Sequence, residues 1–181
     1  AVNRSGSPTG ILEQTAGTAR LLAVPLPPDA DHTAQSRAAR SLLEHALGLD
    51  QPTYGTAPGG KPYLQEHPDI HFSLSHCAGL AVCLISDVPC GVDAELVRPL
   101  PSRVLERAFT AEEQRQVRES RCPDEIFFRL WTLKESFVKA TGAGLSYGLR
   151  RVPVLLDADG LPRCTQPGWR FSQTDLDGGF I

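Results

Sequence analysis

Two apolar segments joined by a short polar turn constrain the fold of this chain most strongly. They occupy residues 70–74 and 80–85, and the turn between them occupies residues 75–79. Strands joined by so short a link pair antiparallel, because a parallel pair needs a crossover connection of a dozen or more residues. A doubly wound parallel sheet is therefore not expected in this region.

Helical periodicity marks two further elements. Apolar residues recur at helical spacing over residues 33–47, with Gly48 placed to end the helix, and a longer helix is predicted over 124–141, with Gly142 beyond it. Short apolar strands are predicted at residues 21–26, 152–156 and 169–173. Helices and antiparallel strands that are interspersed without strict alternation predict an α+β fold.

The remaining segments have the composition of loops, caps and chain ends. Residues 51–62 are rich in proline, glycine and threonine and are expected to form a loop. Thr110 and Glu113 have the spacing of a capping box that begins a short helix. Residues 1–10 are expected to be a flexible tail or a cloning remnant, and residues 180–181 to begin another strand.

Composition excludes several classes of protein. The 18 basic and 21 acidic residues give a net charge of −3, the wrong sign for binding nucleic acid through the overall field. The five cysteines form no CxxC pair, so we expect reduced thiols rather than a disulfide framework or a zinc site. No apolar run approaches the ~20 residues of a membrane span. We expect a cytoplasmic protein that binds neither membrane nor nucleic acid.

Asp93 and Glu95 form an acidic pair in the segment 90–96, CGVDAEL, which alternates apolar and acidic residues and is predicted as a strand. That spacing places the two carboxylates on one face, about 7 Å apart, where they repel each other unless a cation lies between them. Mg²⁺ takes oxygen ligands of this kind and often binds phosphate oxygens as well. The alternative is an ordinary solvated strand face.

The long predicted helix carries an unusual lysine. Its apolar arc consists of Phe127, Leu130, Trp131, Phe137 and Val138. Lys134 projects from within this arc, so its ammonium must either reach water or meet a buried anion. Glu135 and Lys139 are four residues apart on one flank of the helix, where an ordinary i,i+4 ion pair is the alternative to a role in chemistry.

Two further segments could contact an anion. Residues 73–76, SLSH, end an apolar strand, and their hydroxyl, imidazole and turn N–H groups could hold phosphate oxygens; a capped strand end is the alternative. Ser75 and His76 are not expected to form a nucleophile–base pair, because adjacent strand residues point to opposite faces. Lys61 adds a cation on a stiff GGKP loop, which lacks the spacing of a Walker A motif.

In their order and spacing, four segments resemble a 4′-phosphopantetheinyl transferase of the Sfp type. The segments are GKPYL at 60–64, FSLSH at 72–76, GVDAE at 91–95 and FFRLWTLKESFVKATGAGL at 127–145. The resemblance covers roughly residues 21–175, and its most specific parts are the GVDxE and WxxKExxxK motifs in tandem. It implies a pseudo-dimer of two similar α/β lobes, residues 11–90 and 91–181, with the active site in the cleft between them.

The resemblance also implies an activity. Members of this family transfer the 4′-phosphopantetheine arm of coenzyme A to a serine of an acyl or peptidyl carrier protein, release adenosine 3′,5′-bisphosphate and require Mg²⁺. It implies a monomer with coenzyme A as co-substrate and an apo carrier protein as partner. The segment 25–33, before the first predicted helix, is short where family members carry an extra basic helix.

By motif match, three carboxylates would ligate the metal: Asp93, Glu95 and Glu135. Glu135 is also the candidate base for the carrier serine, either directly or through a metal-bound water, and both routes stay open. The chemistry agrees with this assignment, because phosphoryl transfer depends on neutralising charge more than on covalent catalysis by the protein.

The resemblance assigns coenzyme A contacts to a larger group: Arg40, Ser41, Lys61, Ser75, His76, Lys134 and Lys139. Within this group His76 would contact the 3′-phosphate, and Lys61 would lie near the nucleotide. Lys134 and Lys139 would lie beside the pyrophosphate, with Lys139 joining Glu135 in catalysis.

Two other functions fit the same residues. A Mg²⁺-dependent nuclease or phosphodiesterase also combines an acidic pair with Glu and Lys, although the chain lacks the basic stripe of a nucleic-acid enzyme. A non-catalytic module that binds coenzyme A or a carrier protein without turnover is the second alternative.

Because the chain is acidic overall, a carrier protein would dock on a local patch, expected near residues 103–118.

Overall fold

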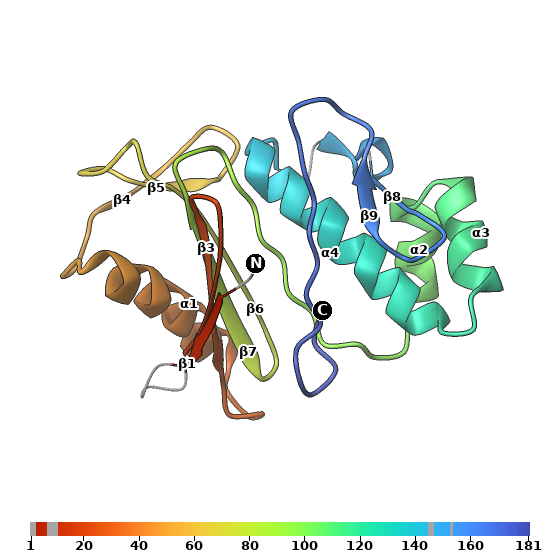
Figure 1. The fold of residues 1–181 in the computed structure, drawn as a ribbon, viewed down its shortest axis with the longest axis horizontal. Coiled ribbons are helices and arrows are strands. Elements are labelled where there is room, and N and C mark those ends of the chain that lie inside the picture. Colours follow the sequence, from red (N-terminus) through yellow and green to blue (C-terminus); the bar gives the residue numbers. More distant parts are fainter. Residues whose placement is uncertain (1–2, 7–10, 145–146, 153) are drawn as a thin grey trace.

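The chain folds into two parts that lie side by side (Figure 1). The computed structural model describes residues 3–6, 11–144, 147–152 and 154–181. One part is built on a sheet covered by helix α1 (His32–Leu47), and the other surrounds the long helix α4 (Pro123–Thr141). Helices and antiparallel strands occur together, as the sequence predicts for an α+β fold.

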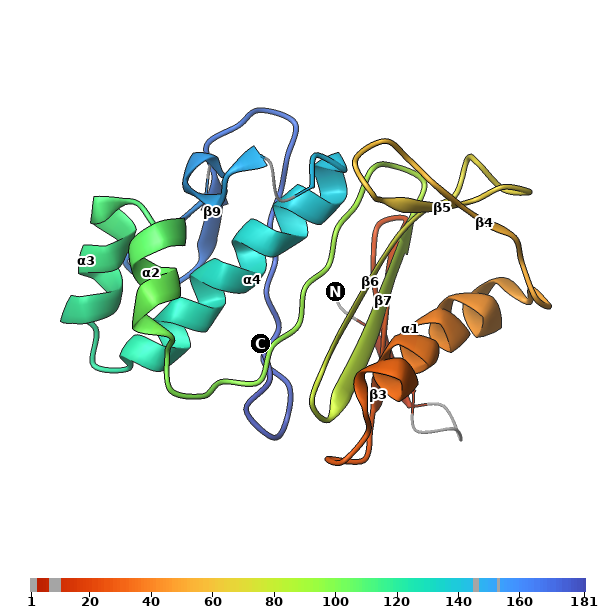
Figure 2. The same cartoon turned by 180° about the vertical axis from the view of Figure 1, so that it is seen from behind.

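The first part contains a five-stranded antiparallel sheet in the order β1-β2-β3-β7-β6. The strands are β1 (Asn3–Gly6), β2 (Leu12–Ala16), β3 (Ala19–Pro25), β6 (His71–Cys77) and β7 (Leu80–Ser86). Strands β6 and β7 form the predicted hairpin, in a register that pairs Phe72 with Ile85. Helix α1 packs against β3, β6 and β7 on one face of the sheet (Figure 2).

Helix α1 begins and ends where the sequence predicts, within one residue. Asp31 caps its start by accepting a hydrogen bond from the backbone N–H of Ala34 at 2.8 Å. Gly48 ends it in the left-handed conformation, with φ of 64°, which glycine adopts without steric cost. Leu43 of this helix packs with Phe72 in the core between helix and sheet.

In the described residues, α-helices, a 3₁₀ helix and a short hairpin form the second part. Its elements are α2 (Ser102–Ala108), α3 (Ala111–Glu119), α4, the 3₁₀ helix η2 (Leu149–Arg151), β8 (Val154–Leu156) and β9 (Pro162–Cys164). The predicted capping box begins α3: the side chain of Thr110 accepts from the Glu113 backbone, and the carboxylate of Glu113 accepts from the Thr110 backbone at 2.7 Å. Within the described residues, no helix is both long and apolar enough to cross a membrane.

Several predicted segments differ from the structure. The predicted loop contains strand β4 (Tyr54–Thr56) and the first residue of its partner β5 (Pro62–Leu64). Residues 169–173 are described and form no strand. Residues 3–6 of the predicted tail pair with β2, because backbone pairing does not require apolar side chains. Residues 1–2 and 7–10 lie outside the described residues.

The acidic segment 90–96 is not a strand of the sheet, which corrects the prediction. Among the described residues, its contribution to β structure is one isolated bridge between Leu96 and Phe180. Glu95 and Ile181 also exchange two backbone hydrogen bonds of 3.0 Å. The expected chain-end strand is thus a short pairing with this segment rather than with the sheet.

The segment 90–96 nevertheless closes the second face of the sheet. Ala94 is buried in a cluster with Leu80 and Val82 of β7, and Phe180 packs against that cluster. Both ribbon views show the chain after β7 passing between the sheet and α4 (Figures 1 and 2). The acidic side chains of this segment therefore lie at the junction of the two parts.

Candidate active site

A pocket of about 360 Å³ lies where strand β6, the segment 90–96 and helix α4 meet. Its lining residues are Leu74, Ser75, His76, Asp93, Glu95, Trp131, Glu135 and Lys139. Six of these eight are among the site residues predicted from the sequence; Leu74 and Trp131 are the additions. The structure thus brings the acidic pair and Glu135 to one place, although about forty residues separate them along the chain.

Helix α4 presents three of the lining residues as one stripe. Trp131, Glu135 and Lys139 are four residues apart, so they share a face of the helix. Burial raises the pKa of Glu135, Asp93 raises it further, Lys139 opposes this shift, and Glu95 adds to it. Burial, and then nearby negative charge, thus disfavour the ionised form of Glu135, and a bound cation would oppose this effect.

Asp93 lies at the centre of a hydrogen-bond network. Its Oδ1 accepts from Lys139 Nζ at 2.7 Å and from Ser75 Oγ at 2.8 Å. The same ammonium donates to Ser75 Oγ at 2.9 Å and to the carbonyl oxygen of Leu74 at 3.4 Å. Only 9% of the Asp93 side chain is exposed, so this pair is poorly screened by solvent. The network ties α4 to the edge strand β6.

Two serines of β6 hold the acidic segment in place. Ser73 Oγ accepts from the backbone N–H of Val92 at 3.0 Å, and Ser75 Oγ accepts from that of Ala94 at 3.3 Å. Both serines are buried. Their hydroxyls satisfy backbone donors that would otherwise be unpaired at the edge of the sheet. Ser75 therefore has a structural role in addition to lining the pocket.

Gly91 allows this segment to approach α4 closely. A Cβ at residue 91 would lie 1.9 Å from the carbonyl oxygen of Ser136 and 2.5 Å from the backbone nitrogen of Ala140. Because both atoms belong to the helix backbone, they cannot move aside as a side chain could. The glycine of the GVDxE motif is thus required by packing rather than by a left-handed φ.

We expect Gly91→Ala to lower the free energy of unfolding by roughly 1–3 kcal/mol, because the added methyl group must displace the segment from α4. Urea denaturation of the purified protein measures the change. Val88→Ala is the control, since Val88 is nearby and 57% exposed, and it should leave the transition nearly unchanged. Equal stability of Gly91→Ala and the unmodified chain would contradict this explanation of the glycine.

Glu95 is paired with a neighbouring arginine. Its Oε2 accepts from Arg98 at 2.7 Å, and the Arg98 guanidinium lies 4.6 Å from the centre of the Phe128 ring. The Glu95 side chain is 21% exposed, compared with 9% for Asp93. The two acidic side chains therefore have different partners although they line the same pocket.

The donor set fits a hard cation in its chemistry. Asp93, Glu95 and Glu135 supply carboxylate oxygens, which Mg²⁺ prefers. As the side chains are placed, the described residues contain no group of three Asp, Glu, His or Cys that could hold a metal ion. Lys139 Nζ lies 2.7 Å from Asp93 Oδ1, so this oxygen is already paired with a cation.

His76 lines the pocket and contacts two residues of helix α1. Its Nδ1 lies 3.1 Å from Gln35 Oε1, and its ring meets the ring of His32 edge-on, with the centroids 4.8 Å apart. Burial lowers the pKa of His76, and His32 and Lys139 lower it further, while Asp93 opposes them. Gln35 carries no motif that sequence reasoning could have used, because only the fold brings α1 against β6.

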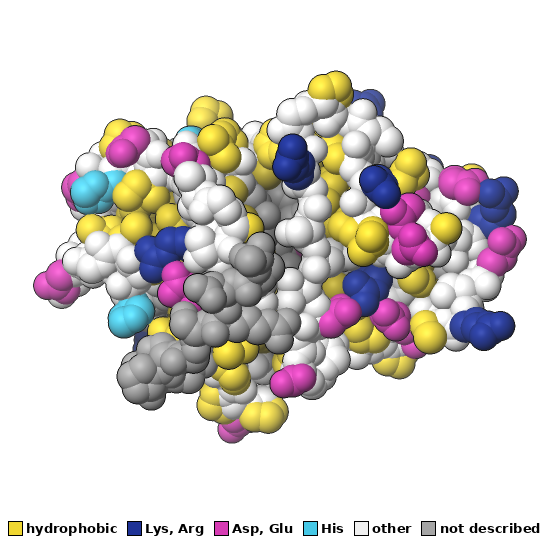
Figure 3. Space-filling view, in the orientation of Figure 1, with side chains coloured by type: hydrophobic (Ala, Val, Ile, Leu, Met, Phe, Trp, Pro, Cys, Tyr) yellow, Lys and Arg dark blue, Asp and Glu magenta, His cyan; other side chains and the backbone are white. Residues whose placement is uncertain are grey.

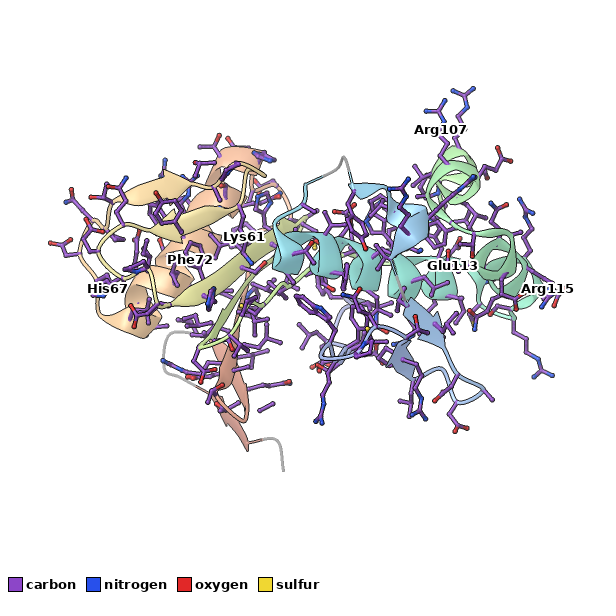
Figure 4. The ribbon with its side chains drawn as sticks, turned by 90° about the horizontal axis from the view of Figure 1, so that it is seen from above. Lys61, His67, Phe72, Arg107, Glu113 and Arg115 are labelled. Atoms are coloured by element: carbon purple, nitrogen blue, oxygen red, sulfur yellow. The ribbon has the colours of Figure 1, made fainter. Side chains whose placement is uncertain are left out.

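Four of the seven residues predicted to contact coenzyme A do not line this pocket: Arg40, Ser41, Lys61 and Lys134. Lys61 donates to the carbonyl oxygens of Cys90 at 2.8 Å and Ala140 at 3.0 Å, at the junction of the two parts (Figure 4). Burial lowers the pKa of Lys61. Arg40 and Ser41 are exposed on α1. Lys61 thus joins the two parts of the fold through backbone carbonyls, and the contacts of Lys61, Arg40 and Ser41 with coenzyme A stay predictions.

Lys134 is fully buried in the second part of the fold. Its Nζ lies 2.7 Å from Glu113 Oε1 and donates to the carbonyl oxygen of Leu149 at 3.0 Å. The sequence predicted that the Lys134 ammonium meets either water or a buried anion, and the buried anion is confirmed. Lys134 does not line the pocket, because its ammonium is enclosed beside Glu113, and its contact with a pyrophosphate stays a prediction.

Comparison with known proteins agrees with these motifs. Residues 89–178 match the family model of the 4′-phosphopantetheinyl transferase superfamily. The chain is 36% identical to the 4′-phosphopantetheinyl transferase psf-1 of Bacillus pumilus over 118 residues, which is 64% of this chain and 51% of that protein. A 4′-phosphopantetheinyl transferase of Bacillus subtilis is 36% identical over 126 residues, covering 67% of this chain and 56% of that protein.

A third relative, the 4′-phosphopantetheinyl transferase HetI of a Nostoc species, is 35% identical over 119 residues, covering 59% of this chain and 49% of that protein. Through residues 89–178, the chain is a member of the 4′-phosphopantetheinyl transferase superfamily. It spans about half the length of these relatives.

Proposed function

We propose that this chain transfers the 4′-phosphopantetheine arm of coenzyme A to a serine of an apo acyl or peptidyl carrier protein. The supporting observation is one pocket that contains Asp93, Glu95, Glu135 and Lys139, in a chain whose relatives are named for this transfer. The reaction breaks a P–O bond of the pyrophosphate, forms a P–O bond to the serine and releases adenosine 3′,5′-bisphosphate. It therefore depends on charge neutralisation and positioning, which such a pocket supplies.

Asp93, Glu95 and Glu135 would hold Mg²⁺ in this proposal. When bound, the ion would neutralise pyrophosphate charge that the protein's few cations in the pocket cannot balance alone. Lys139 would leave Asp93 and contact the pyrophosphate, since its ammonium already lies in the pocket.

Glu135 would accept the proton of the carrier serine. Burial and then Asp93 raise its pKa in the cation-free site, and a bound Mg²⁺ would lower it again, so its strength as a base would depend on occupancy of the metal site. The transfer could run directly from the serine hydroxyl or through one water. Either route would require the Glu135 carboxylate to lie close to the serine hydroxyl that attacks the pyrophosphate.

Ser75 and His76 would contact coenzyme A from β6, with His76 at the 3′-phosphate. Residues 11–90 and 91–181 would act as two lobes, since β6 and α4 line the same pocket from the two sides. The likeness of these lobes to each other stays a prediction. We further propose that the chain acts as a monomer in the cytoplasm.

Intact-mass spectrometry tests the proposal. Apo carrier protein, coenzyme A, Mg²⁺ and the chain should yield a carrier heavier by one phosphopantetheine unit. Carriers of fatty acid, polyketide and nonribosomal peptide synthesis should be tried in parallel, and no mass gain in any of them would contradict the proposal. Retention of coenzyme A without mass gain would instead indicate a binding module.

Incubation with plasmid and Mg²⁺ tests the nuclease alternative. Basic and acidic side chains are intermixed on the face that Figure 3 shows, which is unlike the basic stripe of a nucleic-acid enzyme. We expect the plasmid to remain intact. Strand cleavage that disappears in Glu135→Gln would favour the nuclease and contradict the transferase.

A further inference from the structure

The orientation of one amide on α1 determines which nitrogen of His76 carries hydrogen. Gln35 Nε2 donates to the carbonyl oxygen of Ala30 at 2.8 Å. This bond fixes the amide so that Oε1 is the atom 3.1 Å from His76 Nδ1. An amide oxygen accepts hydrogen bonds and cannot donate them. The nitrogen facing it must therefore be an N–H donor.

We propose that Gln35 is a positioning residue that holds His76 in the Nδ1–H tautomer and so reserves Nε2 for the ligand in the pocket. The hydrogen bond from one ring nitrogen sets the role of the other. With Nδ1 already protonated, Nε2 is the one ring atom that can gain or lose a proton. The assignment of an anion to this nitrogen rests on the proposed function, whereas the tautomer does not.

The surroundings of His76 support a neutral ring before an anion binds. His32 on α1 meets the ring edge-on, Lys139 approaches from α4, and Asp93 lies on the segment 90–96. Burial and the two basic groups lower the pKa of His76, against the opposing effect of Asp93. An anion such as a phosphate would reverse this balance. Its binding should therefore be accompanied by proton uptake at Nε2, while Nδ1 stays bonded to Gln35.

Nitrogen-15 NMR of the histidine side chains tests the tautomer without coenzyme A or carrier protein. The signals of His76 are assigned by their loss in His76→Gln. At neutral pH we expect a protonated-type Nδ1 and an unprotonated-type Nε2. An Nε2–H tautomer in the unmodified chain would overturn the proposal directly.

Two variants of Gln35 separate positioning from packing. Gln35→Leu should shift His76 toward the Nε2–H tautomer, whereas Gln35→Glu should keep Nδ1–H and raise the pKa of the ring, because a carboxylate is a stronger acceptor. Arg37→Ala, an exposed change on the same helix, is the control and should leave the His76 spectrum unchanged. The proposal would be contradicted if His76 kept the Nδ1–H tautomer in Gln35→Leu, or if it lost that tautomer in Gln35→Glu.

Ligand binding gives the second readout. Gln35→Leu should bind adenosine 3′,5′-bisphosphate roughly 3- to 10-fold more weakly, the effect of one net hydrogen bond, and Gln35→Glu should restore the tautomer in the NMR spectrum. If Gln35→Leu changed the tautomer but bound the nucleotide as tightly as the unmodified chain, Nε2 would not contact the anion. That result would overturn the proposed role of Nε2 in ligand binding. Failure of the carrier assay with an intact Nδ1–H tautomer would refute the proposed function alone.

Discussion

Glu135→Gln is expected to slow phosphopantetheine transfer by about 10²–10⁴-fold, the range for removal of a general base. The variant keeps the size of the side chain but can neither accept the serine proton nor supply negative charge to a cation. Initial rates from intact-mass time courses measure the loss. Glu119→Gln is the matched control, because Glu119 is exposed on α3, away from the pocket residues. A rate for Glu135→Gln within tenfold of the unmodified chain would contradict the role of Glu135.

The pH dependence of the rate should show the same carboxylate. A general base works in its ionised form, so activity should fall as the pH drops through the pKa of Glu135. Burial and Asp93 raise that pKa in the cation-free site and a bound cation would lower it, so the fall should move to lower pH as the Mg²⁺ concentration is raised. The acid limb should disappear from the residual activity of Glu135→Gln. If the rate of Glu135→Gln fell with decreasing pH as in the unmodified chain, a group other than Glu135 would cause that fall.

Lys134→Met is expected to lower the free energy of unfolding by about 3–5 kcal/mol, because it leaves the charge of the Glu113 carboxylate buried without a counter-ion. Glu113 lies between α3 and α4 (Figure 4) and also closes the capping box with Thr110, so it joins the two helices. Chemical denaturation followed by circular dichroism measures the change.

An exposed ion pair on α3 provides the control for this measurement. Arg115 and Glu112 lie 2.7 Å apart with more than 60% of each side chain exposed. Arg115→Met should therefore change stability by only about 0.2–1 kcal/mol. Combining Lys134→Met with Glu113→Leu should recover much of the loss, since the unpaired charge is removed. Similar effects of Lys134→Met and Arg115→Met would contradict the buried pair.

Local signals explain what could be predicted from the sequence. The hairpin of β6 and β7, the ends of α1 and the Thr110 capping box depend on residues close together in the chain, and all three are confirmed. Alternation over residues 90–96 wrongly predicted a strand, because a two-residue period carries no information about a pairing partner. The segment is held by serine hydroxyls of β6 rather than by a ladder.

Contacts between distant residues explain what could not be predicted. The position of Lys134 in an apolar arc required either water or an anion, yet nothing local identified Glu113, which lies on another helix. Gln35 and His76 are likewise far apart in the chain and meet only because α1 packs on β6. The acidic pair and Glu135 were brought together by the family resemblance, and the pocket supplies the geometric support.

Binding of Mn²⁺, followed by its electron paramagnetic resonance signal, tests most directly whether the three pocket carboxylates serve one cation. Mn²⁺ stands in for Mg²⁺ because both prefer carboxylate oxygens. We predict one bound ion per chain, and at least roughly tenfold weaker binding in each of Asp93→Asn, Glu95→Gln and Glu135→Gln. Asp177→Asn, at an exposed position, should bind as the unmodified chain does. Unweakened binding in any one of the three pocket variants would contradict a cation shared by these carboxylates.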